Sequence, residues 1–291
     1  MPLHSHDPSP ETIRLVACDV DGTLANPAGE ISPYTRQVLC TLHSYGIEIA
    51  LVTGLNPWVV RRYITAIGPW MLAISLNGTF ILRDDTITDR LLLDIDVARQ
   101  ATEVMVREGY VPLVFGEDLI TRYLPASEEG MQEVRRLMEE RPYQPYQQVD
   151  QATELFSVLP AQVSVCETLE RAERLYSLLA HTLGAKAYVV LQPGTRSWVE
   201  VNHPRAHKHE ALLHLAHYLG IDASEVLYFG DNLNDLPVFE PLPYTVAMAN
   251  ARPEVKARAW RHAPSNAEDG VARFLARFFA LEGNTLPCGA G

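Results

Sequence analysis

The first third of the chain alternates short apolar runs with segments that carry helix-start signals. Residues 13–18, 47–52 and 71–75 are rich in aliphatic side chains, and each run is long enough for one buried strand. The segment after the first run contains Ser32-Pro33, a polar N-cap followed by proline at the first helical position. Strands that alternate with helices in this way are typical of a parallel sheet with right-handed crossover connections.

The same pattern resumes near the carboxyl end, where strands and helices alternate again from residue 198 to residue 281. The stretch between the two halves mixes short strands with longer helices, which is typical of an inserted α+β unit. We therefore predict a doubly wound, mostly parallel, Rossmann-like α/β sheet with an inserted cap domain. The core would comprise residues 12–83 and 198–282, and the cap would comprise residues 84–197.

The amino terminus and the net charge limit the compartment and the partners. Residues 1–10 lack the basic start and apolar stretch of a signal peptide, and no apolar run is long enough to span a bilayer. The net charge of −12 argues against nucleic acid, whose phosphates are bound by surfaces rich in Lys and Arg. We predict a cytoplasmic protein without nucleic-acid or membrane partners, with disordered tails at 1–11 and 283–291. The sequence leaves the oligomeric state open.

The cysteines and histidines give no pattern of a zinc site. Cys18, Cys40, Cys166 and Cys288 have no CxxC spacing, and we expect reduced thiols, with Cys288 in the tail able to cross-link in vitro. Five histidines lie between residues 203 and 217, but no cysteine or carboxylate stands at a familiar spacing from them. A structural or solvated role is favoured for these histidines.

Polar residues follow the carboxyl ends of three predicted strands that are remote in sequence. Asp19 and Asp21 follow the first strand, Thr53 follows the second, and the acidic run 231–235 follows a strand in the second half. Ligands of open α/β sheets bind outside the carboxyl ends of the strands, so these groups should converge there. Several carboxylates at one point repel one another, and a hard divalent cation such as Mg²⁺ removes that penalty.

Such a set of side chains suits phosphoryl transfer. A carboxylate that does not serve only as a metal ligand can attack phosphorus and form an aspartyl-phosphate. The Thr53 hydroxyl and the Lys208 ammonium would stabilise the equatorial oxygens. Asp21, two residues beyond Asp19, is placed to protonate the leaving alcohol and later to deprotonate water.

Seven short motifs follow one another along the chain. They are Asp19-Val20-Asp21-Gly22-Thr23-Leu24, Val52-Thr53-Gly54, Leu76-Asn77-Gly78-Thr79, Lys208 with Ala211-Leu212, Gly230-Asp231-Asn232-Leu233-Asn234-Asp235, Ala247-Met248-Ala249-Asn250-Ala251 and Asp269-Gly270-Val271-Ala272. In this order they resemble the haloacid dehalogenase (HAD) superfamily and, more narrowly, its Cof-type phosphatases with a large type IIB cap. The resemblance covers residues 14–279.

The resemblance implies roles for the first motifs. Asp19 would be the nucleophile and a ligand of Mg²⁺, the implied cofactor. Asp21 would be the general acid/base and would give the metal its backbone carbonyl. Thr53, Gly54 and Lys208 would bind the phosphoryl group.

The later acidic motif would complete the metal site. Asp231 would be the second metal carboxylate, Asn234 would join the phosphate-binding residues and Asp235 would join the metal ligands. Asn234 and Asp235 could instead orient the lysine and Asp231. Two positions depart from the family pattern: Leu55 stands where Arg is frequent, and His209 stands where Gly is frequent. Both affect which substrate fits rather than the core chemistry.

We predict a Mg²⁺-dependent phosphomonoesterase that acts on a small phosphorylated metabolite, namely a sugar phosphate, a nucleotide or pyridoxal phosphate. The cap would close over the sheet, exclude water and select the leaving group. A phosphatase dedicated to a phosphorylated disaccharide or a glycosyl-phosphoglycerate is an alternative. Carbon–halogen cleavage is disfavoured because it would leave Asp21 and the acidic run 231–235 idle. A phospho-acceptor signalling domain would be much shorter, and a metabolite-binding protein would not need a complete metal set.

Overall fold

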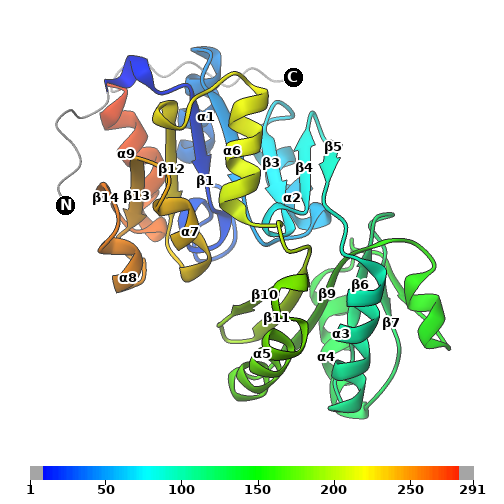
Figure 1. Ribbon diagram of the computed structural model, residues 1–291. Helices are drawn as coiled ribbons and strands as arrows, with labels where there is room; N and C mark the ends of the chain where they lie inside the picture. The colour runs from blue at the N-terminus through cyan, green and yellow to red at the C-terminus, as the bar shows by residue number, and fades with distance from the viewer. Residues whose placement is uncertain (1–8, 282–291) are drawn as a thin grey trace. The chain divides into compact units, whose positions relative to one another are not determined.

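The computed structural model describes residues 9–281, which form two compact units (Figure 1). Within the described residues, the first unit comprises 9–56, 60–89 and 208–281, and the second comprises 57–59 and 90–207. Most of the two predicted tails, and Cys288 with them, lie outside the described residues.

An eight-stranded sheet forms the centre of the first unit. Its strands are, in spatial order, β14 (Arg261–Ala263), β13 (Tyr244–Met248), β12 (Val226–Gly230), β1 (Leu15–Cys18), β2 (Glu48–Val52), β3 (Leu72–Ser75), β4 (Phe80–Arg83) and β5 (Thr86–Arg90). The six strands from β14 to β3 are parallel, and β4 runs antiparallel to β3. The strands β1 and β12 are buried along their whole length, as expected for a parallel sheet with both faces covered.

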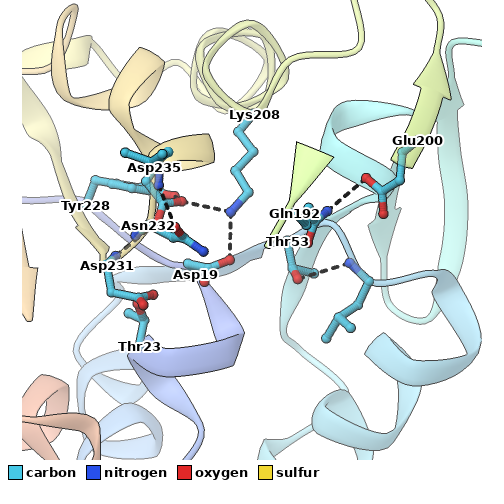
Figure 2. Close-up of polar contacts among 12 residues, drawn as sticks. Asp19, Thr23, Thr53, Gln192, Glu200, Lys208, Tyr228, Asp231, Asn232 and Asp235 are labelled. Carbon is cyan, nitrogen blue, oxygen red and sulfur yellow. Dashed lines mark hydrogen bonds and ion pairs between the residues drawn. The ribbon is translucent and has the colours of Figure 1, made fainter. Parts of the chain in front are cut away.

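Helices connect these strands in the predicted alternation. They are α1 (Pro33–Ser44), α2 (Pro57–Ile67), α6 (Lys208–Tyr218), α7 (Leu236–Phe239), α8 (Pro253–Lys256) and α9 (Gly270–Phe278). The predicted cap of α1 is present, since the Ser32 hydroxyl accepts a hydrogen bond from the Thr35 amide at 3.0 Å. Helix α6 crosses the sheet with its first residue, Lys208, at the end where β1 and β12 terminate (Figures 1 and 2).

The second unit is a six-stranded sheet with three helices. Its strands are, in spatial order, β10 (Tyr188–Gln192), β11 (Ser197–Asn202), β9 (Pro160–Glu167), β6 (Leu113–Gly116), β7 (Thr121–Tyr123) and β8 (Tyr146–Gln148). Its helices are α3 (Ile95–Arg107), α4 (Glu128–Glu140) and α5 (Leu169–Leu183). The predicted fold class, an α/β core with an α+β cap, is therefore confirmed. No helix within residues 9–281 has the length and apolar character needed to cross a membrane.

The boundaries of the insertion differ from those that the sequence predicted. The chain was expected to leave the core after residue 83, but it first adds β5 at the edge of the core sheet. It was expected to return before residue 198, but the strand at this point, β11, pairs antiparallel with β9 and β10 in the second unit. The assignment of 198–201 to the core sheet was therefore wrong.

The side-chain alternation along β11 explains this error. Val199 and Val201 join the apolar core beneath α3 and α5, whereas Glu200 and Asn202 are buried polar residues of the opposite sheet face. One apolar face and one polar face are typical of an antiparallel strand, whereas a central parallel strand is apolar on both faces. Polar residues at alternate positions are thus the signal that the sequence interpretation overlooked.

The cysteines also depart from expectation at one position. Cys18 and Cys166 are buried free thiols, whereas Cys40 is disulfide-bonded. The expectation of reduced thiols is therefore wrong for Cys40.

The packing at the start of α9 gives a test of the core. A Cβ at Gly270 would lie 2.0 Å from the Pro264 carbonyl oxygen, so Gly270→Ala must displace backbone. We expect the free energy of unfolding, measured with urea, to fall by about 3 kcal/mol. The control is Gly46→Ala, where a new Cβ meets no atom within 4 Å and only the positive φ of 83° is unfavourable. A loss of about 1 kcal/mol is expected there. Equal losses in the two variants would contradict the packing argument.

Candidate active site

Asp19 stands directly after β1, in a tight turn that closes on itself. The Asp19 amide donates to the Phe229 carbonyl of β12 at 2.9 Å, and the Asp19 carbonyl accepts from the Leu24 amide at 3.2 Å. Gly22 has a φ of 80°, and a Cβ at this position would lie 2.4 Å from Asp231 Oδ2. Glycine is therefore required here for two reasons, the left-handed backbone and the close approach of a carboxylate.

Two asparagines from the closing segments hold this turn in place. Asn250 Nδ2 donates to the Gly22 carbonyl at 2.7 Å, and Asn266 Nδ2 donates to the Ala25 carbonyl at 2.8 Å. The Asn266 amide in turn donates to Asn250 Oδ1 at 3.1 Å. The sequence interpretation did not single out Asn266, which stands three residues before the last motif and outside any recognised pattern.

Three carboxylates converge beside the turn (Figure 2). Asp19, Asp231 and Asp235 each offer an oxygen, and these oxygens lie within 4.8 Å of one another. The Thr23 hydroxyl donates to Asp231 Oδ1 at 2.8 Å and so orients this carboxylate. Asp19 and Asp235 are buried, whereas Asp231 is partly exposed. A cluster of hard oxygen donors of this kind suits a divalent cation such as Mg²⁺.

One ammonium bridges two of these carboxylates. Lys208 Nζ lies 2.7 Å from Asp19 Oδ1 and 2.7 Å from Asp235 Oδ1, and the lysine is only 3% exposed. The predicted convergence of a helix-start lysine with the strand-end aspartates is therefore present in the structure.

The site carries more negative than positive charge, and this excess contributes to the pKa shifts of its residues. Burial raises the pKa of Asp19 well above its ordinary value; Asp235 and Asp231 raise it further, and the charge of Lys208 opposes the shift. Burial and the neighbouring Asp235 raise the pKa of Asp231 to about 6. Burial alone would lower the pKa of Lys208, but Asp19 and Asp235 raise it above its ordinary value, so the lysine stays charged. The excess negative charge is what a bound cation would neutralise.

Asp235 already uses both of its oxygens. Oδ1 accepts from Lys208 Nζ and from the Tyr228 hydroxyl, each at 2.7 Å. Oδ2 accepts from the amides of Asp231 and Asn232, each at 3.0 Å. A carboxylate with four donors is poorly available to a metal, so this geometry favours the orienting role over the ligand role for Asp235.

The second predicted motif forms a braced loop after β2. The Thr53 hydroxyl accepts from the Leu55 amide at 3.1 Å, and the Thr53 carbonyl accepts from the Asn77 amide at 3.0 Å. The Ser75 hydroxyl donates to the Leu55 carbonyl at 2.7 Å. Leu76 and Asn77 have positive φ values of 47° and 55°, so the Asn-Gly turn serves to support the loop that carries Thr53. Figure 2 shows Thr53 on one side of Asp19.

The remaining predicted residues lie around this cluster. Asp21 is exposed and Gly54 is partly buried. Asn234 Oδ1 is buried and accepts no hydrogen bond within residues 9–281. A buried acceptor without a protein partner is commonly satisfied by a donor such as water. A phosphoryl oxygen is itself an acceptor, so this observation does not bear on the predicted phosphate-binding role of Asn234, which stays a prediction.

A family model for haloacid dehalogenase-like hydrolases matches residues 16–275. The chain belongs to this family. The match spans both units and includes every predicted site residue. The protein is thus a hydrolase of the HAD superfamily, and the resemblance drawn from the motifs is confirmed.

Individual proteins are similar to this chain over nearly its whole length. YxeH of Bacillus subtilis is 29% identical over 269 residues, which cover 90% of this chain and 97% of YxeH. The pyridoxal phosphate phosphatase YbhA of Escherichia coli is 24% identical over 91% of this chain and 98% of its own. A haloacid dehalogenase-like hydrolase from Bacteroides thetaiotaomicron superposes with a TM-score of 0.80 at 22% identity and covers 92% of this chain and 100% of its own. BT4131, described as a subclass IIB sugar phosphatase, gives a TM-score of 0.75 at 18% identity over 91% and 98% of the chains.

The bridge made by Lys208 should support the fold as well as the site. Lys208→Met removes the ammonium that offsets Asp19 and Asp235 and leaves both carboxylates buried, so we expect the free energy of unfolding to fall by about 3 kcal/mol at neutral pH. The loss should shrink as the pH is lowered, because the raised pKa of Asp19 lets the folded variant take up a proton at this carboxylate. The control is Lys186→Met at an exposed position, where we expect little change. Equal stability of the two variants in urea titrations would count against a stabilising bridge.

Proposed function

We propose that this hydrolase is a Mg²⁺-dependent phosphatase of small phosphorylated metabolites and that Asp19 forms an aspartyl-phosphate. The observation that carries the proposal is the position of Asp19. It is a buried carboxylate at a strand end, held by Lys208 at 2.7 Å, and its oxygens lie within 4.8 Å of those of two further aspartates. The similarity to YbhA, which is named for pyridoxal phosphate, supports a small phosphomonoester as substrate.

The residues present fit the proposed metal. Asp19 and Asp231 would supply carboxylate ligands, and Asp21 would supply its backbone carbonyl. Asp235 would hold the loop around Asp231 through the hydrogen bonds that its Oδ2 accepts from two backbone amides. When bound, Mg²⁺ would neutralise the carboxylates and polarise the phosphoryl oxygens.

In the first step, a carboxylate oxygen of Asp19 attacks phosphorus. The new bond joins this oxygen to phosphorus, and the bond from phosphorus to the leaving-group oxygen breaks. Asp21, which is exposed and two residues away, gives its proton to that oxygen, so the product leaves as a neutral alcohol. Lys208, fixed on Asp19 Oδ1, sets the direction in which the carboxylate faces.

In the second step, water hydrolyses the aspartyl-phosphate. Asp21, now ionised, takes a proton from the water as its oxygen attacks phosphorus. The bond between phosphorus and the Asp19 oxygen breaks, which releases inorganic phosphate and restores the carboxylate. Thr53, Lys208 and Asn234 would donate hydrogen bonds to the phosphoryl oxygens in both steps.

The sheet of the second unit carries two hydrogen-bonded pairs of polar side chains. Gln162 Nε2 donates to Asn202 Oδ1 at 2.9 Å, and Gln192 Nε2 donates to Glu200 Oε2 at 2.8 Å. Each glutamine uses one N–H of its amide in these pairs, so a second N–H donor and the carbonyl acceptor remain. Sugar hydroxyls both donate and accept hydrogen bonds, so we propose sugar phosphates as the first class to test.

Replacing the nucleophile gives the direct test of the reaction. Asp19→Asn keeps the shape of the side chain but removes the attacking carboxylate, so Mg²⁺-dependent hydrolysis of an aryl phosphate should fall by at least about 1,000-fold. The control Asp96→Asn changes an aspartate whose side chain is 85% exposed, and its rate should match the wild type. Circular dichroism would check that both variants are folded. Unchanged turnover in Asp19→Asn would refute the assignment.

The raised pKa of Asp231 predicts how Mg²⁺ binding depends on pH. Because this pKa is about 6, the metal must displace a proton below that pH, and the apparent affinity at about pH 5.5 should be roughly fourfold lower than at about pH 7.5. The affinity falls at low pH because a proton on Asp231 then neutralises the buried charge in place of the cation. At high pH the carboxylate is ionised and the cation neutralises it. Thermal unfolding with MgCl₂, against NaCl at equal ionic strength, should show the larger stabilisation at the higher pH. An equal rise in the unfolding temperature at the two pH values would contradict this prediction.

A further inference from the structure

Tyr228 is a fully buried polar side chain in the central strand β12. It is 0% exposed, and its ring packs edge to face on Phe239, with centroids 5.9 Å apart and planes at 87°. On β1, its neighbour in the register is Ala17, two residues before Asp19. A buried phenol needs a hydrogen-bond partner, and the identity of that partner indicates what the residue does.

The partner of Tyr228 is Asp235. The phenol donates to Asp235 Oδ1 at 2.7 Å, and the same oxygen accepts from Lys208 Nζ at 2.7 Å (Figure 2). Asp235 Oδ2 is held by two backbone amides of its own loop. Asp235 is therefore fixed by donors from three separate segments, namely β12, α6 and the loop after β12.

This arrangement controls where the lysine stands. Lys208 Nζ is shared between Asp19 and Asp235 at equal distances of 2.7 Å. A second donor on Asp235 Oδ1 limits rotation of the carboxylate and fixes the point to which the ammonium is attached on that side. Without the phenol, Asp235 could turn about its side-chain bond, and Nζ could move with it relative to the nucleophile.

We propose that Tyr228 is a positioning residue that acts through Asp235 to hold Lys208 against Asp19. It does not contact the substrate, and its hydroxyl supplies the last of the four hydrogen bonds that fix Asp235. The inference deepens the proposed function and rests on it for the kinetic effect alone, since the effect on Lys208 requires no reaction.

The test removes the hydroxyl and keeps the ring. Tyr228→Phe should lower kcat for an aryl phosphate with Mg²⁺ by about 10- to 100-fold, the factor that corresponds to one hydrogen bond to a charged group. The matched control is Tyr63→Phe, which removes the hydroxyl of another buried tyrosine of the core unit, hydrogen-bonded to the Gly29 carbonyl at 3.3 Å, and should leave kcat within about twofold. Thermal unfolding of both variants would confirm that they are folded.

A second readout follows the lysine itself. The chain has three lysines, at positions 186, 208 and 256, so ¹⁵N-lysine labelling gives a spectrum with few side-chain signals. Lys208 is the buried one, and its signal can be assigned with Lys208→Met. Tyr228→Phe should shift this signal and leave those of Lys186 and Lys256 in place, whereas Tyr63→Phe should shift none of the three.

The two readouts separate the proposals. A reduced kcat together with a shifted Lys208 signal supports the positioning role. An unshifted Lys208 signal in Tyr228→Phe overturns it, whatever kcat does, and so does a kcat equal to that of Tyr63→Phe in an active enzyme. If the wild type hydrolyses no phosphate ester, the proposed function fails, and the Lys208 signal still decides whether Tyr228 holds the lysine.

Discussion

The rest of the site depends on one buried ammonium that is shared by two buried carboxylates. Lys208 stands 189 positions after Asp19 in the chain, yet its Nζ lies 2.7 Å from Asp19 and from Asp235. Placing the acids together without this charge would be costly, because each would be desolvated and repelled by its neighbours. One lysine cannot neutralise three aspartates, so the cluster remains suited to a divalent cation. The excess negative charge that is unfavourable for stability thus also makes the site suitable for a cation.

The sheet topology makes this convergence possible. Strands β1 and β12 are adjacent and parallel, so the turn after one and the acidic loop after the other emerge at the same edge. Gly22 allows the two segments to approach closely, since a Cβ there would collide with the Asp231 carboxylate. The closing segments add Asn250 and Asn266, which tie the turn from the other side. The sheet topology therefore determines the site, because the segments that follow its strands supply the side chains of the site.

Sequence patterns were sufficient for β1, β2 and β3 and for the polar residues that follow β1, β2 and β12. Buried parallel strands are continuous apolar runs, and caps such as Ser32 mark helix starts, so both have local signals. The error occurred where the signal depends on the partner strand: β11 was assigned to the core sheet, but it pairs with β9 and β10 in the second unit. The role of Tyr228 was not predictable, because a tyrosine within an apolar run looks like core until its hydroxyl is seen on Asp235.

Asp231 and Asp235 show why residue type alone does not assign a role. They stand four positions apart in one motif, and both have a carboxylate near Asp19. Asp235 is fully buried and accepts four hydrogen bonds, whereas Asp231 is partly exposed and its side chain is oriented by Thr23. A metal ligand needs an available lone pair, and an organising residue needs all of its lone pairs occupied. By this criterion, the two aspartates fit different roles: Asp231 fits the proposed metal ligand, and Asp235 holds the lysine, the tyrosine and the loop in place.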